Sequence, residues 1–452
     1  MKKSLIPLII GIIIGGLLIY FFHPQAAKTV EPTVPVVEET SFNAVAQSLD
    51  SQGTFYMYLS TEKAMTAIET FLTELKSMAL ARMKDDDKKS AEAEKTLGFL
   101  LSFVRTSGLF DIDGIGMSSI AIDETYKRNV VVIHHAEDKG AGKIWDMTGA
   151  PPHELACLKL LPADTVFASF SDFRLKNLWE WLKADLTNSG IPKLAQGVSM
   201  VEPMLIGQGI DPAKLLECLA GQPGIVITLS QDKMVTIPAE DKTMEIPEPA
   251  GAFMFRTNND YLFDLLKQKI PGALVTEEKG LKKIAIPIPP EPMPIELKPQ
   301  IVQTANRLML VSNDRILNEI LEAEANGKGL VDTEEFKRIS QGIPSVGNGL
   351  RYISPRLGAI LSKLQQEAIM SNEKMAADVK EMLKKLSPFT KAIGLYGVTQ
   401  VNDEGFTFTF NNSMSLGNMM VTLPAVMVTG IVAAVAIPSY LGKKQNSQVP
   451  NS

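Results

Sequence analysis

The pattern of apolar and polar positions repeats four times along the chain, as a short strand-like run followed by a stretch of helical period. The runs cover residues 55–59, 166–170, 252–255 and 350–353, and the stretches after them cover residues 61–83, 172–186, 258–270 and 355–386. In the second stretch the apolar face comprises Leu175, Leu178, Trp179 and Leu182, spaced as on one side of a helix. Because each strand and each helix has an apolar face, the units must pack on one another.

Further strand-like runs lie between these units, at residues 117–122, 129–134, 225–230, 282–288, 307–312, 393–401 and 406–410. The last two form the clearest hairpin pattern, because both alternate and a glycine-containing turn, residues 402–405, separates them. Hairpins indicate antiparallel pairing. The predicted fold class is therefore α+β, with repeated strand-helix-hairpin units and helices packed on a largely antiparallel sheet. We expect the body to form two similar halves, residues 41–245 and 246–412.

An uncharged apolar run near the beginning of the chain predicts an N-terminal transmembrane helix. Residues 5–22 carry no charge, and this length of helix is just enough to cross a bilayer. Lys2 and Lys3 precede the run, which places this end in the cytoplasm. Gly11 and Gly15 are spaced to allow close helix packing in a membrane. We assign residues 1–23 to the anchor and the proline-containing residues 24–40 to a semi-extended linker.

A cleaved signal peptide is the alternative interpretation of this run. Signal peptides have a shorter apolar stretch, of about 7–15 residues, followed by a cleavage site with small residues. The nearest candidate, Gln25-Ala26-Ala27, has a large polar residue where a small one is expected. The sequence favours an uncleaved anchor.

A second uncharged run, residues 419–441, predicts a C-terminal transmembrane helix. Lys443 and Lys444 follow it, so the tail at residues 442–452 is also expected in the cytoplasm, and residues 413–418 form a short linker before it. Both ends then place the body outside the membrane. The predicted location is the bacterial cytoplasmic (inner) membrane, with a periplasmic body. The alternative is a buried C-terminal helix of a soluble domain.

The composition narrows the class of protein. The chain has 452 residues, of which 45% are hydrophobic and 21% charged, so it has enough apolar mass for a folded core. The net charge of −6 argues against a nucleic-acid partner. The expected partners are the membrane, other envelope proteins and, in one alternative, a lipid.

No motif for catalysis or cofactor binding stands out. The histidines His23, His134, His135 and His153 show no metal-binding spacing. The sequence Gly140-Ala141-Gly142-Lys143 lacks the first glycine and the hydroxyl residue of a phosphate-binding loop. We therefore expect no cofactor, no metal site and no catalytic residue.

The two cysteines leave a choice open. Cys157 and Cys218 could form a disulfide, because the expected compartment is oxidising. Both also lie in apolar helical surroundings, where two separate buried thiols are equally natural.

Two resemblances add expectations. Residues 430–440, ending in Ala436-Ile437-Pro438-Ser439-Tyr440, resemble the membrane helix of type IV pilins and type II secretion pseudopilins, although those proteins carry it near their N-terminus. The Leu-Pro-Ala-Asp-Thr sequence at residues 161–165 and the Gly-Ile-Asp-Pro sequence at residues 209–212 resemble families of uncharacterised, membrane-anchored bacterial envelope proteins. Those families imply a location and an architecture but no chemistry.

The sequence supports three functional hypotheses that a structure can separate. The first is a binding or scaffold protein of the envelope, which includes an accessory role in a pilus-like or secretion-like machinery. It predicts a filled interior and an exposed apolar patch. The second is a carrier or sensor of an apolar ligand such as a lipid, which predicts a large apolar cavity. The third is a hydrolase, which predicts a cleft with converging, perturbed polar groups.

Overall fold

One antiparallel sheet organises the protein, and the computed structural model describes residues 40–81, 87–136, 142–149, 151–239, 242–278, 280–288, 295–371, 381 and 394–419. The strands of the sheet are β1 (Phe55–Ser60), β2 (Ile112–Ala121), β3 (Lys127–His135), β5 (Thr165–Ser171), β6 (Gly224–Ala239), β7 (Lys242–Arg256), β8 (Leu274–Glu278), β9 (Leu281–Ala285), β10 (Gln300–Gln303), β11 (Arg307–Val311), β13 (Gly349–Ile353), β14 (Leu395–Asn402) and β15 (Gly405–Asn412). Two short strands, β4 (His153–Glu154) and β12 (Val346–Gly347), pair separately.

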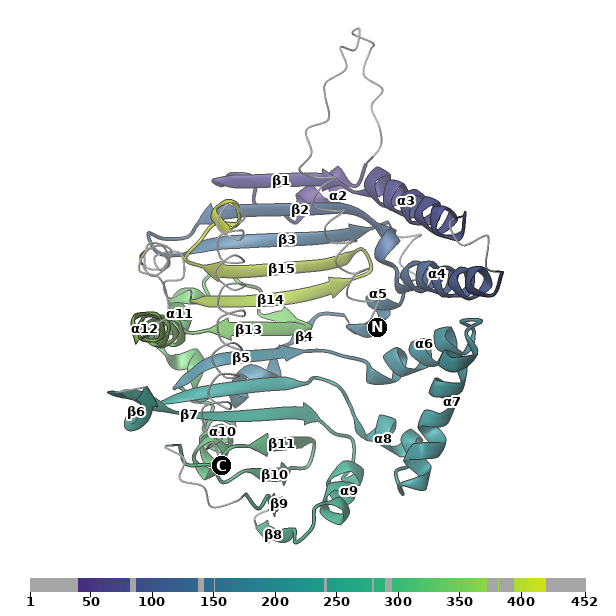
Figure 1. The fold of residues 1–452 in the computed structure, drawn as a ribbon. Helices are drawn as coiled ribbons and strands as arrows, with labels where there is room; N and C mark the ends of the chain where they lie inside the picture. The colour runs from purple at the N-terminus through teal and green to yellow at the C-terminus, as the bar shows by residue number, and fades with distance from the viewer. Residues whose placement is uncertain are drawn as a thin grey trace, which may run out of the picture. The chain divides into compact units, whose positions relative to one another are not determined.

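The thirteen strands are arranged in the order β1-β2-β3-β15-β14-β13-β5-β6-β7-β11-β10-β9-β8, and every neighbouring pair is antiparallel (Figure 1). The helices are α2 (Phe42–Gln47), α3 (Glu62–Ala81), α4 (Asp87–Ser107), α5 (Lys143–Met147), α6 (Leu175–Thr187), α7 (Pro192–Gly207), α8 (Pro212–Cys218), α9 (Tyr261–Lys269), α10 (Asp314–Asn326), α11 (Glu334–Ile339) and α12 (Pro355–Ser371). The short 3-10 helices are η1 (Leu109–Asp111), η2 (Ala156–Leu160) and η3 (Leu330–Asp332).

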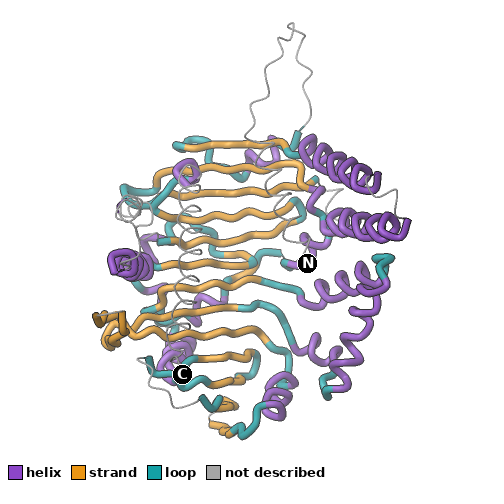
Figure 2. Tube along the Cα trace, viewed as in Figure 1, coloured by secondary structure: helices purple, strands orange, loops and turns teal. Residues whose placement is uncertain are grey.

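The predicted α+β class with a largely antiparallel sheet is confirmed. Three of the predicted units have the same topology: β1, β5 and β13 each lead into helices and then pair with the first strand of the hairpin that follows, namely β2-β3, β6-β7 and β14-β15. The run at residues 252–255 departs from this pattern, because it is the end of β7 and pairs with β11. Figure 2 shows the strands side by side, with helices at their ends.

The two predicted halves are not laid out as separate sheets. The boundary at residues 245 and 246 falls inside β7. Strands β13 to β15, from the second half, lie between β3 and β5, which belong to the first half. A long-range arrangement of this kind leaves no trace in the local hydrophobic pattern, on which the division was based.

The predicted transmembrane helices require a correction. Across the residues that the structure describes, no helix has both the length and the apolar composition needed to cross a bilayer. Residues 1–23, including Gly11 and Gly15, and residues 420–441 lie outside the described residues. On this finding the fold class is α+β without the two added helices, and the predicted inner-membrane location with cytoplasmic termini is not retained.

The main core lies against one face of the sheet. Alternate strand residues supply it, including Ala168 of β5, Tyr352 of β13 and Tyr396 of β14, which are buried. Helix α10 covers them with Ile316 and Ile320, both fully buried. Each such side chain contributes about 1.5–3 kcal/mol through its burial.

Local signals fix the ends of α10. The side chain of Asn313 accepts a hydrogen bond from the Ile316 N–H at 3.2 Å, which satisfies one of the free donors of the first turn. Gly327 closes the helix with a φ of +63°, a left-handed conformation that glycine adopts without strain. The sequence pattern did not predict this helix, although it has the best-separated apolar face of the described helices.

A smaller core lies on the same face at the β1 end of the sheet. Val45 of helix α2 and Leu49, two residues after its end, pack against Val130 and Val132 of β3. This close approach depends on Gly116 of β2, where an added Cβ would lie 2.2 Å from a methyl carbon of Val45. The glycine is therefore required by packing rather than by a turn.

Candidate functional site

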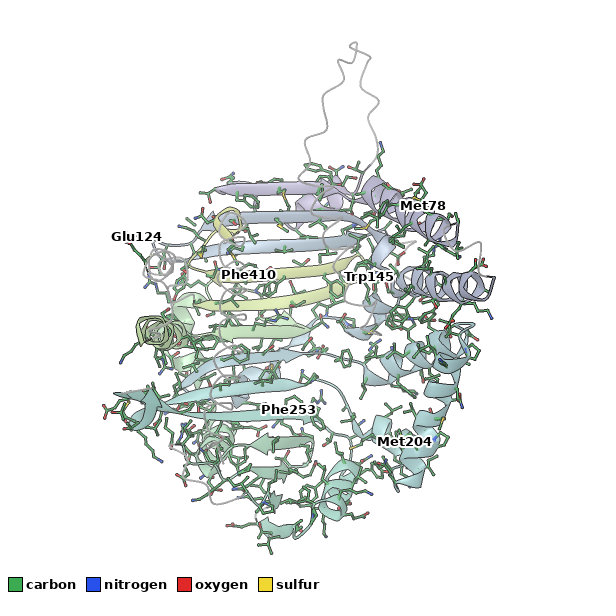
Figure 3. All side chains as sticks on the ribbon, in the orientation of Figure 1. Met78, Glu124, Trp145, Met204, Phe253 and Phe410 are labelled. Atoms are coloured by element: carbon green, nitrogen blue, oxygen red, sulfur yellow. The ribbon has the colours of Figure 1, made fainter. Side chains whose placement is uncertain are left out.

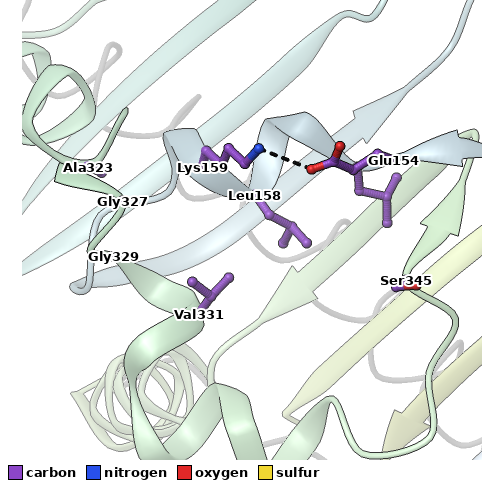
Figure 4. Close-up of a pocket in the computed structure, with 9 residues that line it drawn as sticks. Glu154, Leu158, Lys159, Ala323, Gly327, Gly329, Val331 and Ser345 are labelled. Carbon is purple, nitrogen blue, oxygen red and sulfur yellow. Dashed lines mark hydrogen bonds and ion pairs between the residues drawn. The ribbon is translucent and has the colours of Figure 1, made fainter. Parts of the chain in front are cut away.

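A cavity of about 300 Å³ opens beside η2, where the chain between β4 and β5 meets the end of α10 and η3 (Figure 4). It is lined by Glu154, Leu155, Leu158, Lys159, Ala323, Gly327, Gly329, Val331 and Ser345. Its size is at the lower end of pockets that hold small molecules. The cavity can take a small apolar group, such as one side chain or a short ligand.

The polar groups of this cavity do not converge on a reacting position. Glu154 and Lys159 pair with each other at 3.0 Å, and their side chains are 73% and 63% exposed. An exposed ion pair of this kind contributes little and is available to solvent. The cavity therefore has the character of an apolar recess with a charged rim, not of a catalytic cleft.

A second cluster of polar groups lies at the end of β5, next to β4. The Nε2 atom of His153 is 2.8 Å from the Oδ2 atom of Asp172. Asn348 donates from its side-chain amide to the same carboxylate at 3.2 Å, and Gln222 donates to its other oxygen at 3.4 Å. The backbone N–H of Asp172 also donates to the Asn348 carbonyl. Four segments of the chain thus meet at one carboxylate.

The contacts of the two His153 ring nitrogens determine which chemical roles this cluster could take. Its Nδ1 atom faces the backbone carbonyl of Glu154 at 2.9 Å, while Nε2 faces Asp172. The Glu154 carbonyl and, more weakly, the Asp172 carboxylate raise the pKa of His153 above 6.5, against the effect of burial, which lowers it. Both ring nitrogens thus lie within hydrogen-bond distance of an oxygen atom of the chain. A general base or a metal ligand needs a free lone pair, and here each ring nitrogen already faces an oxygen of the chain.

The aspartate of the Leu-Pro-Ala-Asp-Thr sequence belongs to a buried charge cluster. Asp164 accepts a hydrogen bond from Arg315 at 3.0 Å. Arg315 also bonds to Glu319 at 2.9 Å and lies 3.5 Å from Glu248, whose side chain is only 2% exposed. Burial raises the pKa of Asp164 and of Glu319, although the nearby arginine opposes the shift. The motif thus has a structural explanation.

The remaining histidines on β3 have separate partners. His134 lies 2.6 Å from Asp113, which sits in a bulge of β2. His135 packs its ring against Trp145, with 4.4 Å between ring centroids. Within the described ranges, no group of three or more His, Cys, Asp or Glu side chains is placed to hold a metal ion.

Both cysteines are buried and are free thiols in the structure. Burial raises the pKa of Cys157 to about 12, so its thiolate form is strongly disfavoured. The Sγ atom of Cys218 donates to the backbone carbonyl of Asn259 at 3.3 Å. A thiol nucleophile needs a lowered pKa and an accessible position, and neither is met at Cys157.

The second half of helix α7 exposes large apolar side chains. Met200, Met204 and Ile206 are each more than half exposed, and Met204 is labelled in Figure 3. The helix contains two charged residues. Lys193 lies in its first turn, and Glu202 is turned toward α6, where it accepts hydrogen bonds from Trp179 and Lys183. A surface helix normally presents charged residues to water. The solvent-exposed side of α7 has unusually few of them.

Helix α3 has a similar but smaller exposed patch. Phe71 and Met78 are 48% and 51% exposed, and Leu75 lies between them one turn from each. Apolar side chains at this spacing form a continuous stripe along the helix. Helices α3 and α7 therefore both present apolar surface to solvent.

The sequence did not identify these features as a site. The contact of His153 with Asp172 depends on the pairing of β4 with β12, two strands of two residues each. Asn348 reaches the carboxylate from 176 positions further along the chain. The chain has 21 methionines, but their number does not show which helix exposes them.

Comparisons of the chain with known protein families, with curated proteins and with solved structures give no match.

Proposed function

We propose that the protein acts by binding another protein, as a scaffold, rather than by catalysis. The observation that carries the proposal is the outer face of α7, on which Met200, Met204 and Ile206 are each more than half exposed. Methionine is flexible and polarizable, so it fits partner surfaces of irregular shape. Exposed apolar patches on soluble domains commonly mark interaction sites.

The interior supports the same proposal. The described core is filled by packed side chains from the sheet, α10 and α11. The cavity beside η2 is about 300 Å³ and opens to the surface. The His153–Asp172 cluster has both imidazole nitrogens occupied. These features favour a binding role over a hydrolase.

The dimensions of α7 suit a docking element. Its sixteen residues extend over about 24 Å. A stable interface buries about 800 Å² on each partner, and a few central side chains supply most of its energy. Met200 and Met204 lie one turn apart and would provide such a centre.

The test is photo-cross-linking in cells that naturally make the protein. A benzophenone amino acid replaces Met204, and a matched control places it at Glu180, an exposed position on α6. We expect one discrete cross-linked protein from position 204, and we expect the added substitution Met200→Lys to remove it. No product at position 204, or the same products at both positions, would refute the proposal.

A carrier role is the second candidate, and the cavity beside η2 is its support. Leu155, Leu158 and Val331 provide an apolar lining. Native mass spectrometry of the purified protein would show a bound small apolar molecule as a stoichiometric mass increase. The substitution Leu158→Gln should remove that increase if the cavity holds the ligand, and an unchanged adduct would place the ligand elsewhere.

A further inference from the structure

Two arginines face each other where the neighbouring strands β7 and β11 meet the edge of the main core (Figure 1). Arg256 and Arg307 are partners in the antiparallel register. Their side chains therefore leave the same face of the sheet, with Cβ atoms about 4.5–5.5 Å apart. Met254 and Met309, two positions away on the same strands, are buried in the main core. Like charges directly opposite each other destabilise a sheet, so an anion beside this pair is favourable.

The protein itself compensates the two positive charges only in part. Glu324 of α10 accepts a hydrogen bond from Nη1 of Arg307 at 3.3 Å. Only 13% of the Arg307 side chain is exposed, yet no hydrogen bond from the described residues reaches its Nε or Nη2 atom. Arg256 is exposed, and within the described part of the chain it forms no ion pair. Several N–H donors of the pair are thus free for a ligand.

A strained turn holds the backbone of Arg256 beside the Asp172 cluster. The Arg256 N–H donates to the carbonyl of Gly221 at 3.0 Å. The next residue, Gln222, has a φ of +53°, a left-handed conformation that residues with a side chain rarely adopt, and its amide donates to Asp172 at 3.4 Å. Strain of this kind persists where the surrounding structure enforces it, and it is concentrated at ligand sites.

The charges around the pair indicate which anion fits. His153, when protonated, is balanced by Asp172, which lies 2.8 Å away. Arg307 is balanced by Glu324. Arg256 remains as one excess positive charge. A singly charged group such as a carboxylate suits one excess charge better than a phosphate monoester, which carries about −1.5 to −2 at neutral pH.

We propose that Arg256 and Arg307 together bind the carboxylate group of a ligand. Each guanidinium is planar and offers parallel N–H donors, which match the two oxygens of a carboxylate. Arg307 is held by Glu324 and by its position at the edge of the core, and Arg256 reaches the same group from the solvent side. The carboxylate belongs to a free small acid or to the end of a peptide chain, since both present the same chemistry.

The direct test is a chemical-shift titration of the arginine Nε–H groups in the full chain, with sodium acetate as the probe at constant ionic strength. We expect a saturable shift of the Arg307 signal, which its absence in Arg307→Lys identifies. Arg256→Gln should weaken acetate binding about tenfold, whereas Arg105→Gln, at an exposed ion pair on α4, should leave it unchanged. No saturable shift, or equal affinity in the parent and Arg256→Gln, would overturn the proposal.

Glu324 supplies a test in the opposite direction. Glu324→Gln removes the carboxylate that competes for Arg307, so it should strengthen acetate binding severalfold. A purely structural role of the arginines predicts no such gain. Urea titrations of Arg256→Gln and Glu324→Gln check that both variants remain folded, and weaker acetate binding in Glu324→Gln would contradict the proposed site.

Further probes separate the kinds of ligand. N-acetyl-trialanine with a free carboxyl group should bind, and its amide should not. Tighter binding of the peptide than of acetate would identify a chain end as the source of the carboxylate, and equal binding would identify a small acid. An amide that binds as tightly as the acid, or inorganic phosphate that binds more tightly than acetate, would overturn the assignment to a carboxylate.

Discussion

The imidazole of His153 and the carboxylate of Asp172, 2.8 Å apart, connect the short strand β4 to the end of β5. Asn348 joins them from the end of β12, so the small sheet β4-β12 is tied to the large one. Backbone groups contribute as well, because the Asn348 carbonyl accepts from the Asp172 N–H. The cluster thus holds together segments that are far apart in sequence.

This pair predicts a specific pH dependence of stability. The folded pKa of His153 is raised above 6.5, so the protonated imidazole stabilises the fold fully below that pH. The contribution is lost as the pH rises through the folded pKa. Because the His153 side chain is 39% exposed, solvent screening limits the contribution to about 0.5–1 kcal/mol.

Urea unfolding of the parent and of His153→Gln at pH 5.5, 7 and 9 measures this effect. At pH 5.5 we expect the parent to have a larger free energy of unfolding than His153→Gln. This difference between the two proteins should shrink toward pH 9. Asp172→Asn, which keeps the shape of the side chain, should reduce the same pH dependence without abolishing it, because the Glu154 carbonyl still raises the pKa of His153. A difference that is constant with pH would show that His153 stabilises the fold through packing alone.

Arg315 predicts a much larger effect, because its guanidinium faces three carboxylates that are buried or partly buried. Asp164, Glu248 and Glu319 all face it. Arg315→Leu removes the cation that faces Asp164 and Glu319, whereas Glu248 keeps its ion pair with Lys233 at 2.8 Å. The variant should lower the free energy of unfolding by about 3–5 kcal/mol. The loss should be smaller at low pH, where Asp164 and Glu319, whose pKa values burial raises, take up protons.

The matched control for this variant is Arg105→Leu. Arg105 forms an ion pair with Glu69 on the surface, and its side chain is 51% exposed. Its loss should cost no more than about 1 kcal/mol in the same urea titration. Equal losses for the two variants would mean that the Arg315 cluster is no more stabilising than an ordinary surface pair.

The thiols predict the behaviour of the protein toward redox reagents. Cys157 and Cys218 are free and buried. Both should fail to react with Ellman's reagent in the folded protein and should react fully in denaturant, giving two thiols per chain. A reducing agent should leave the thermal midpoint unchanged. A single mass lower by about 2 Da, with no reactive thiol in denaturant, would instead demonstrate a disulfide.

The sequence predicted helices and strands correctly where their hydrophobic pattern lies within a few neighbouring residues. The hairpin β14-β15 is an example: the turn was predicted at residues 402–405, and in the structure Asn402 pairs with Gly405 across it. Helix α6 was also predicted, but its orientation was not. Trp179 was assigned to the buried face, whereas Trp181 is the buried one and stacks on Phe103 of α4.

The reason for the difference lies in tertiary packing. Trp181 is buried because α4 lies beside α6 and because Thr106 and Asp185 accept from its indole N–H. Trp179 instead donates to Glu202 of α7. Neither neighbour can be read from the period of α6 itself. The same holds for the His153–Asp172 cluster, whose members come together only through the order of strands in the sheet.

The outer face of α7 gives a prediction that separates a binding role from a structural one. Met200 and Met204 are 57% and 58% exposed, so replacing both with lysine removes little buried area. The double variant should keep its free energy of unfolding within about 0.5 kcal/mol of the parent. Val198 of the same helix is 6% exposed, and Val198→Ala should cost roughly 1–3 kcal/mol. A large loss of stability in the lysine variant would show that the two methionines are covered by the protein's own chain, and the proposed docking face would then have to be abandoned.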